Sequence, residues 1–160
     1  VLEYKSVIKK LKAIRPDMTF SSDFIVGFPG ETEDDFNKTI ELIKDIEFEQ
    51  SYSFIYSKRP GTPAASLDDA TSHQEKKDRL NFLQETINNL SKDRSKSIIG
   101  KKVEILVESV SSKHSNMING RTTNNKIITV PGNKDLVGKL INVQVNELNN
   151  KTLKGEILEV

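Results

Sequence analysis

The segment Gly27, Phe28, Pro29, Gly30 and Glu31 has the residue types of a ligand-binding loop. It lies between an apolar run that predicts a strand and a polar segment that predicts the start of a helix. In parallel α/β folds, ligands bind beyond the carboxyl ends of the strands, where glycines let the backbone approach them and helix N-termini offer free N–H groups. The loop is therefore a candidate nucleotide site. It is not a P-loop, because no Gly-Lys-Ser/Thr follows, and the alternative is a tight turn with capping acids.

Basic side chains in the last third of the chain are candidate contacts for a polyanion. Residues 100–160 carry 9 Lys+Arg against 6 Asp+Glu, whereas residues 1–70 carry 9 against 13. The basic candidates are Lys101, Lys102, Lys113, Arg121, Lys126, Lys134 and Lys139. Because this part has no Trp, Tyr or Phe, stacking of bases on aromatic rings is excluded there, and contacts to nucleic acid would be electrostatic and salt-sensitive. The alternative is that these are ordinary solvated charges.

The composition excludes several classes of chemistry. With no cysteine, this chain can have no disulfide, no thiolate metal site, no cysteine-ligated iron–sulfur cluster and no cysteine nucleophile. The 2 histidines have no partner at metal-ligand spacing, so no metal site is predicted. No apolar run approaches the roughly 20 residues that span a bilayer, and we expect a cytoplasmic protein with no membrane contact.

Helical and strand periods alternate in the first part of the chain. An apolar helical stripe runs from Tyr4 to Ile14 and stops before Pro16. The run Phe24–Val26 lacks alternation and predicts a strand buried on both faces. Thr32 with Asp35 predicts a helix N-cap, and the row Tyr52, Phe54 and Tyr56 predicts a second strand that we expect in the core. Helix, strand, helix and strand in this order indicate an α/β fold with a parallel sheet.

The pattern then changes to one helix and an all-β segment. After a loop rich in Pro and Gly, Ser72 and Glu75 predict a cap for a helix that keeps its spacing to about Ser97. From Lys101 the apolar period becomes two, and five short strands are predicted in about 60 residues. A small closed barrel of the OB kind accommodates that number. The fold class is α/β followed by all-β.

Three motifs together carry a resemblance to a known family. They are Ser22–Thr32, the segment Phe54–Ala65 with its Lys-Arg-Pro-Gly-Thr centre, and Gly120-Arg121-Thr122. With the helix and terminal barrel in the same order, the chain resembles the C-terminal part of radical S-adenosylmethionine methylthiotransferases over essentially all 160 residues. Within that family it is most similar to the members that add a methylthio group to isopentenyl-adenosine next to the tRNA anticodon.

The resemblance implies an organisation and a set of sites. Residues 1–70 would be the last strand-helix units of a partial TIM-type barrel, 71–98 a connector helix, and 99–160 a five-stranded TRAM-like barrel that holds tRNA. The loop formed by Gly27, Phe28, Pro29, Gly30 and Glu31 would line the S-adenosylmethionine pocket. Substrate or RNA contacts are expected from Tyr56, Arg59, Lys101, Lys102, Arg121 and Lys126.

The family's cluster-binding cysteines are missing from this chain. Both 4Fe-4S clusters of the family are held by N-terminal cysteines, so no residue here can ligate either of them. We therefore expect a C-terminal fragment that is inactive alone and needs a separate N-terminal, cluster-bearing part. Two alternatives stay open: a non-catalytic RNA-binding TRAM module, and a fragment of the related enzyme that methylthiolates a ribosomal protein.

Two strands cannot complete a barrel. We expect residues 1–70 to leave strand edges and one sheet face uncovered, and to be mobile or prone to aggregation, while the terminal barrel folds by itself.

Overall fold

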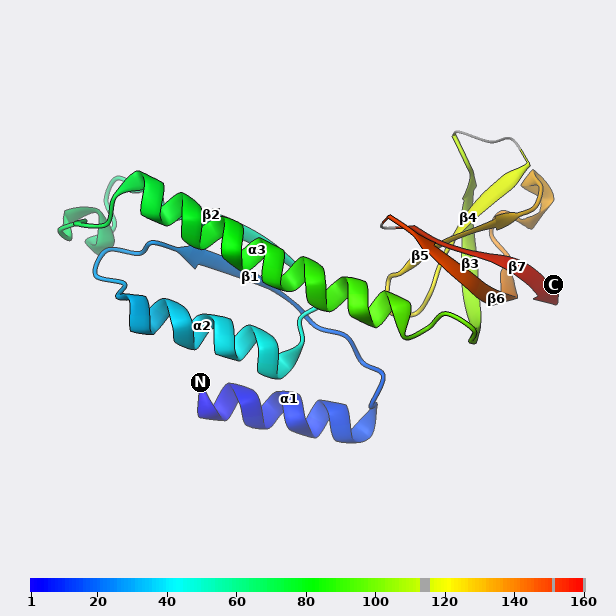
Figure 1. The fold of residues 1–160 in the computed structure, drawn as a ribbon, viewed down its shortest axis with the longest axis horizontal. Helices are drawn as coiled ribbons and strands as arrows, with labels where there is room; N and C mark the ends of the chain where they lie inside the picture. Colours follow the sequence, from blue (N-terminus) through cyan, green and yellow to red (C-terminus); the bar gives the residue numbers. More distant parts are fainter. Residues whose placement is uncertain (113–115, 151, 160) are drawn as a thin grey trace. The chain divides into compact units, whose positions relative to one another are not determined.

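The structure is a computed structural model that describes residues 1–112, 116–150 and 152–159 (Figure 1). It divides into two compact units, Val1–Ser91 and Lys92–Val160, and each is described by itself. Among the described residues, no helix has the length and apolar character needed to cross a membrane.

The first unit combines helices with a two-stranded parallel sheet. Its elements are α1 (Leu2–Ile14), β1 (Ser21–Val26), α2 (Glu33–Ile46), β2 (Gln50–Ile55), a short 3-10 turn (Pro63–Ser66) and most of α3 (His73–Lys96). Strands β1 and β2 pair in parallel from Ser21↔Gln50 to Val26↔Ile55. The predicted order of helix, strand, helix and strand is confirmed.

Helix α2 begins at the cap that the sequence predicts. Thr32 accepts a hydrogen bond from the Asp35 N–H at 3.1 Å, and the Asp35 carboxylate accepts one from the Thr32 N–H at 3.2 Å. This reciprocal capping box satisfies two N–H groups that the helix cannot satisfy itself. Because the Thr32 hydroxyl hydrogen-bonds its carboxylate, the pKa of Asp35 is lowered. The helix ends at Glu47, which adopts the left-handed conformation with φ 59°.

The core of the first unit lies on one face of the sheet only. Phe24 and Val26 point into a core formed with residues of all three helices. Ile25, between them, is 59% exposed, so the prediction of a strand buried on both faces is wrong. Tyr52 and Phe54 are 76% and 56% exposed, so the expectation that they belong to the core is wrong as well. The physical reason is that helices cover one face and no element of this unit covers the other.

Two helices contribute to this core in ways that the apolar stripes did not show. In α1 only Ile8 is buried, while Val7 and Ile14 on the same predicted stripe are exposed. In α3, Leu83 and Ile87 are buried in the core of the first unit. The first part of this helix is therefore the third helix of the α/β unit, with Ser72 accepting a hydrogen bond from the Glu75 N–H at 3.2 Å.

The second unit is a closed five-stranded barrel, as predicted. Its strands are β3 (Lys102–Val110), β4 (Met117–Arg121), β5 (Ile127–Pro131), β6 (Leu140–Asn149) and β7 (Thr152–Glu159), with a 3-10 turn at Lys134–Leu136. They close in the order β3-β4-β5-β7-β6, with β5 and β7 parallel and the other pairs antiparallel. Nine buried aliphatic residues fill the interior: Ile105, Val107, Ile118, Ile128, Val130, Ile141, Val143, Val145 and Leu153.

Glycine permits a close approach at one point of the barrel wall that matters for the site. A Cβ atom at Gly120 would lie 2.6 Å from the Cδ1 atom of the buried Ile105. A side chain there would require the buried Ile105 to shift. The next residue, Arg121, points to the opposite face of the strand.

Candidate functional site

The glycine loop of the first unit is shaped by its own hydrogen bonds. Gly27 and Gly30 both have positive φ, +68° and +85°, a conformation that glycine adopts without steric cost. The N–H of Glu31 donates to the carbonyl of Phe28 at 2.8 Å, which closes a tight turn. The carboxylate of Glu31 turns back and accepts the N–H of Gly27 at 2.7 Å. The five residues therefore form the tight turn that was the alternative interpretation. The same turn is the candidate binding loop.

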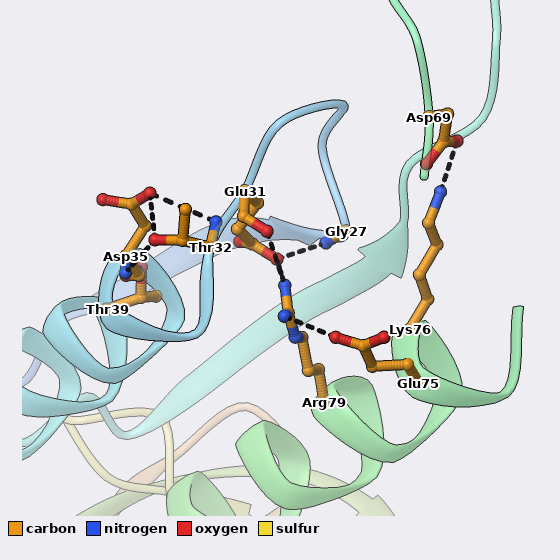
Figure 2. A network of polar contacts seen from close by, with 9 residues as sticks. All are labelled: Gly27, Glu31, Thr32, Asp35, Thr39, Asp69, Glu75, Lys76 and Arg79. Carbon is orange, nitrogen blue, oxygen red and sulfur yellow. Dashed lines mark hydrogen bonds and ion pairs between the residues drawn. The ribbon is translucent and has the colours of Figure 1, made fainter. Parts of the chain in front are cut away.

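A buried arginine holds the carboxylate of this loop. Arg79 of α3 donates from Nη1 to the Oε2 of Glu31 at 2.8 Å and to the Glu31 carbonyl at 3.1 Å. Its Nη2 donates to Glu75 at 2.7 Å. The side chains of Arg79 and Glu31 are 8% and 12% exposed, so this ion pair is largely removed from water. Figure 2 shows the guanidinium between the two carboxylates.

A second buried cation on α3 lies beside the first glycine of the loop. The stem of Lys76 packs against Gly27, where a Cβ atom would come within 2.5 Å of the Lys76 Cγ atom. The ammonium group forms an ion pair with Asp69 at 2.5 Å, and both side chains are mostly buried (Figure 2). The first turns of α3 thus contact the loop after β1 and the loop after β2.

Tyr56 lies beside the same loop at the end of β2. Its N–H donates to the carbonyl of Val26 at 2.9 Å, and its ring meets Phe28 edge to face with centroids 5.1 Å apart. The Tyr56 hydroxyl is buried without a hydrogen-bond partner in the described structure, as is Oδ1 of Asp69. Arg59 is exposed in the following turn, which its carbonyl stabilises by accepting the Thr62 N–H at 3.2 Å.

The loop has no ligand for an iron–sulfur cluster, and its role in binding a nucleoside-type ligand stays a prediction. Gly30 is exposed, and a Cβ atom there would meet nothing within 4 Å. The unpaired hydroxyl of Tyr56 is a buried group that a polar ligand can satisfy. No cysteine exists in the sequence, and among the described residues no group of three His, Asp or Glu could hold a metal ion.

In the barrel, one hairpin brings two of the candidate basic residues together. Arg121 ends β4, and Lys126 directly precedes β5. Arg121 donates to Glu108 at 2.9 Å and to the side-chain oxygen of Asn125 at 2.9 Å, with a third of its side chain exposed. Lys126 donates to Ser95 at 2.6 Å and is half-buried. Both cations are thus positioned by neighbours.

The remaining basic candidates are more dispersed. Lys102 forms an ion pair with Glu159 at 3.2 Å, and Lys101 is exposed just before β3. Lys134 and Lys139 are exposed in the connection between β5 and β6. Lys113 lies outside the described residues. The first four lie on the barrel surface, and the role of each in RNA binding stays a prediction.

The barrel register reveals an exposed row that the sequence analysis missed. Arg121 pairs with Leu106 on one side and with Ile127 on the other, and Leu106 pairs with Leu140. Directly paired residues share a face of the sheet. The three aliphatic side chains are 43% to 60% exposed, so a continuous row crosses the outer face of β6, β3, β4 and β5. We call this the outer row.

A sequence signal for the outer row existed. Each aliphatic member stands next to a core residue, as in Ile105-Leu106, Ile127-Ile128 and Leu140-Ile141. Because successive side chains of a strand point to opposite faces, only one member of such a doublet can enter the core. The other must lie outside.

Comparisons with known proteins found matches that together cover residues of both units. The family model of the TRAM domain matches residues 96–158. The tRNA-2-methylthio-N(6)-dimethylallyladenosine synthase of Francisella philomiragia subsp. philomiragia is 52% identical over 158 residues, which cover 99% of this chain. The synthase of the same name from Francisella tularensis subsp. novicida is 51% identical over the same share. The chain is thus similar to these synthases over 36% of their length.

The match has defined limits. The chain spans 36% of the length of these curated relatives, and only residues 96–158 match the domain model. The resemblance to the C-terminal part of this family, and the α/β plus OB-like fold class, are confirmed. The match spans 99% of this chain and so includes the glycine loop, α3 and the barrel.

Proposed function

We propose that this chain supplies the tRNA-docking surface and one wall of the S-adenosylmethionine pocket of a radical S-adenosylmethionine methylthiotransferase. The substrate would be isopentenyl-adenosine near the anticodon, and the place of action would be the cytoplasm. The observation that carries the proposal is the 52% identity over 158 residues to a synthase named for this reaction. Two features of the structure support it: the buried, unpaired hydroxyl of Tyr56 beside the glycine loop, and the partly exposed cation Arg121 on the barrel.

The cofactor wall is assigned to the loop after β1. Gly27, Phe28, Pro29 and Gly30 would offer backbone groups, and Tyr56 would offer its buried hydroxyl. Glu31 would act from behind the loop, because its Oε2 already accepts from Gly27 and Arg79. When bound, S-adenosylmethionine would supply the radical and the methyl group of the reaction. This chain's own part is to bind and orient it.

Docking of RNA is assigned to the outer row and the hairpin beside it. Arg121 offers a planar cation that can contact phosphate or stack on a base, and Leu106, Ile127 and Leu140 offer apolar surface for ribose. Lys126 is next to Ile127 on the same hairpin. The excess of basic over acidic residues in 100–160 gives the unit the charge that an RNA backbone requires.

The RNA proposal is tested with the full chain and an anticodon stem-loop at several salt concentrations. We expect the logarithm of the association constant to fall linearly with the logarithm of salt concentration. Arg121→Ala is expected to weaken binding about fivefold to tenfold and to reduce the slope by about 1. Lys44→Ala in α2, which also removes one exposed cation, serves as the control and should change little. Absence of binding, or binding that salt does not weaken, would contradict the proposal.

Catalysis requires residues that this chain lacks. With no cysteine to ligate a cluster, we propose that the chain alone is inactive and that its Arg59 and Tyr56 act only beside a cluster-bearing part. The test joins the full chain to the rest of the Francisella philomiragia synthase and measures methylthiolated adenosine in tRNA by mass spectrometry. Product from the fusion and none from the chain alone is expected. Product from the chain alone would overturn the assignment.

A second candidate is a TRAM module that binds RNA without catalysis. It is favoured by one observation: the barrel is closed and complete, whereas the α/β unit leaves a sheet face open. A fusion that binds the stem-loop yet makes no product, with the relative's own protein active in parallel, would support this candidate.

A further inference from the structure

Two buried cations lie three residues apart on α3, and each is bound to a different loop. Arg79 holds Glu31, which follows β1, and Lys76 holds Asp69, in the segment that follows β2. Both loops begin at the carboxyl edge of the parallel sheet. Positions i and i+3 of a helix share a face, so one helix surface reaches both loops.

The contact from Arg79 reaches the backbone of the glycine loop through one carboxylate oxygen. Oε2 of Glu31 accepts from Arg79 at 2.8 Å and from the Gly27 N–H at 2.7 Å. The guanidinium also donates to the backbone carbonyl of Glu31. The side chain of Glu31 therefore ties the last residue of the loop to the first, and Arg79 from another element holds that side chain in place.

Burial makes this arrangement sensitive to the identity of the cation. Arg79 is 8% exposed, and a fork of N–H groups lets it serve Glu31 and Glu75 simultaneously. Its guanidinium also lies 5.6 Å from the ring centroid of Phe36 in α2. Lysine has one point charge and cannot meet both carboxylates in the same geometry.

We propose that Arg79 is a positioning residue for the S-adenosylmethionine pocket, which it shapes by holding Glu31 against the Gly27 N–H. This inference rests on the proposed function for the identity of the ligand, but not for the positioning itself. Lys76 has the parallel task for the loop after β2, through Asp69. The helix that carries both would then be part of the pocket's scaffold, with both side chains buried against the loops.

The positioning is tested first in the full chain, without any ligand. The amide hydrogen exchange of Gly27 is measured by ¹⁵N NMR in the unaltered chain and in Arg79→Gln, Arg79→Lys, Lys76→Met and Lys77→Gln. We expect exchange of Gly27 to become at least about tenfold faster in Arg79→Gln and to be partly restored in Arg79→Lys, because a charge next to Glu31 is kept. Lys77→Gln is the matched control, since Lys77 is exposed on the same helix.

The variant Lys76→Met tests the loop after β2 separately from the loop after β1. Methionine keeps a stem against Gly27 but removes the ion pair with Asp69, so residues near Asp69 should exchange faster while Gly27 does not. The amide of Phe24 in β1 reports on general unfolding in every variant. Unchanged Gly27 exchange in Arg79→Gln, or acceleration of Phe24 and Gly27 together in both Arg79 variants, overturns the proposal.

The second measurement is the dissociation constant for S-adenosylmethionine, determined by equilibrium dialysis of the fusion described above. Arg79→Gln is expected to raise it about tenfold, Arg79→Lys less, and Lys77→Gln not at all. If the unaltered fusion binds no S-adenosylmethionine, the proposed function fails, and the exchange of Gly27 still decides whether Arg79 holds the loop. If the unaltered fusion binds it and Arg79→Gln binds equally well, the role of Arg79 in the pocket is overturned.

Discussion

The two units bury apolar residues by different means. The barrel closes on itself, so every strand has two neighbours and nine aliphatic side chains are enclosed. The α/β unit has two strands, with helices on one face and Ile25, Tyr52 and Phe54 exposed on the other. Closure removes strand edges, whereas a two-stranded sheet keeps both of them. An exposed apolar side chain therefore lies outside a closed sheet in the barrel, but on an uncovered sheet face in the α/β unit.

In the barrel, the exposed apolar residues lie on the outer surface of a closed sheet whose interior is already filled. Leu106 and Ile127 flank Arg121 on the outside of a filled interior. In the α/β unit, the exposed residues lie where a complete sheet would have a second covered face. The first kind of exposure lies outside a filled interior, and the second lies on a sheet face that no element of this unit covers.

The largest effect is expected from a cavity in the closed barrel. Ile141→Ala removes a side chain that is 1% exposed, and the loss of contacts should lower the free energy of unfolding of the barrel by about 2–5 kcal/mol. Urea denaturation followed through barrel amide signals measures it. The matched control is Ile25→Ala on the open sheet face, which should change stability by less than about 0.5 kcal/mol. Equal costs at both positions would break the comparison.

A weaker effect is expected on self-association. Replacing Tyr52 and Phe54 together by threonine keeps strand propensity and removes the exposed aromatic surface of the open face. Any self-association of the chain should weaken about tenfold, or about 1.4 kcal/mol, as measured by sedimentation velocity. The comparison variant, Leu106→Thr with Ile127→Thr, should leave self-association unchanged. The opposite ranking of the two variants would assign the association surface to the barrel.

The cap of α2 offers a smaller, local test of the α/β unit. Thr32→Ala removes the hydroxyl that accepts the Asp35 N–H, and should cost about 1 kcal/mol. Urea denaturation of the first unit measures this, and the barrel transition should not move. Thr39→Ala is the control, because its hydroxyl donates to a carbonyl and caps nothing. A shift of the barrel transition by Thr32→Ala would show that the units are not independent.

The smallest effect concerns the titration of Asp35. Its pKa is lowered, first of all by the side-chain hydrogen bond with Thr32, so its carboxylate stabilises the fold at pH values above its unfolded pKa. That contribution is lost as the pH falls through the lowered pKa, below about pH 4. An NMR titration of the Asp35 carboxyl should show its pKa rising toward the ordinary value in Thr32→Ala. An unchanged pKa would remove Thr32 as the cause.

Local patterns were sufficient where a residue's neighbours in sequence determine its structure. The cap at Thr32, the end of α1 before Pro16 and the five barrel strands follow from hydrogen-bonding groups, proline geometry and the period of two. The glycine loop was also found from its residue types. What local patterns could not supply was which face of β1 and β2 would be covered.

Apolar doublets and triplets show why that choice was missed. Phe24-Ile25-Val26 has the composition of a strand buried on both sides, yet only the first and third residues are buried. The same rule assigns Leu106 and Ile127 to the outside of the barrel. A strand has two faces whatever its sequence, and the elements available to pack on each face decide which side chains are buried.

The order of the elements, the absence of cysteine ligands, the family resemblance and the loop at residues 27–31 all follow from the amino-acid sequence. Only the packed chain shows that Arg79, 48 residues further along, holds Glu31, and that Leu106, Arg121 and Ile127 form a row. The physical reason is that capping, turns and periodicity depend on neighbours in the chain, whereas ion pairs between elements and rows across strands depend on how the chain packs.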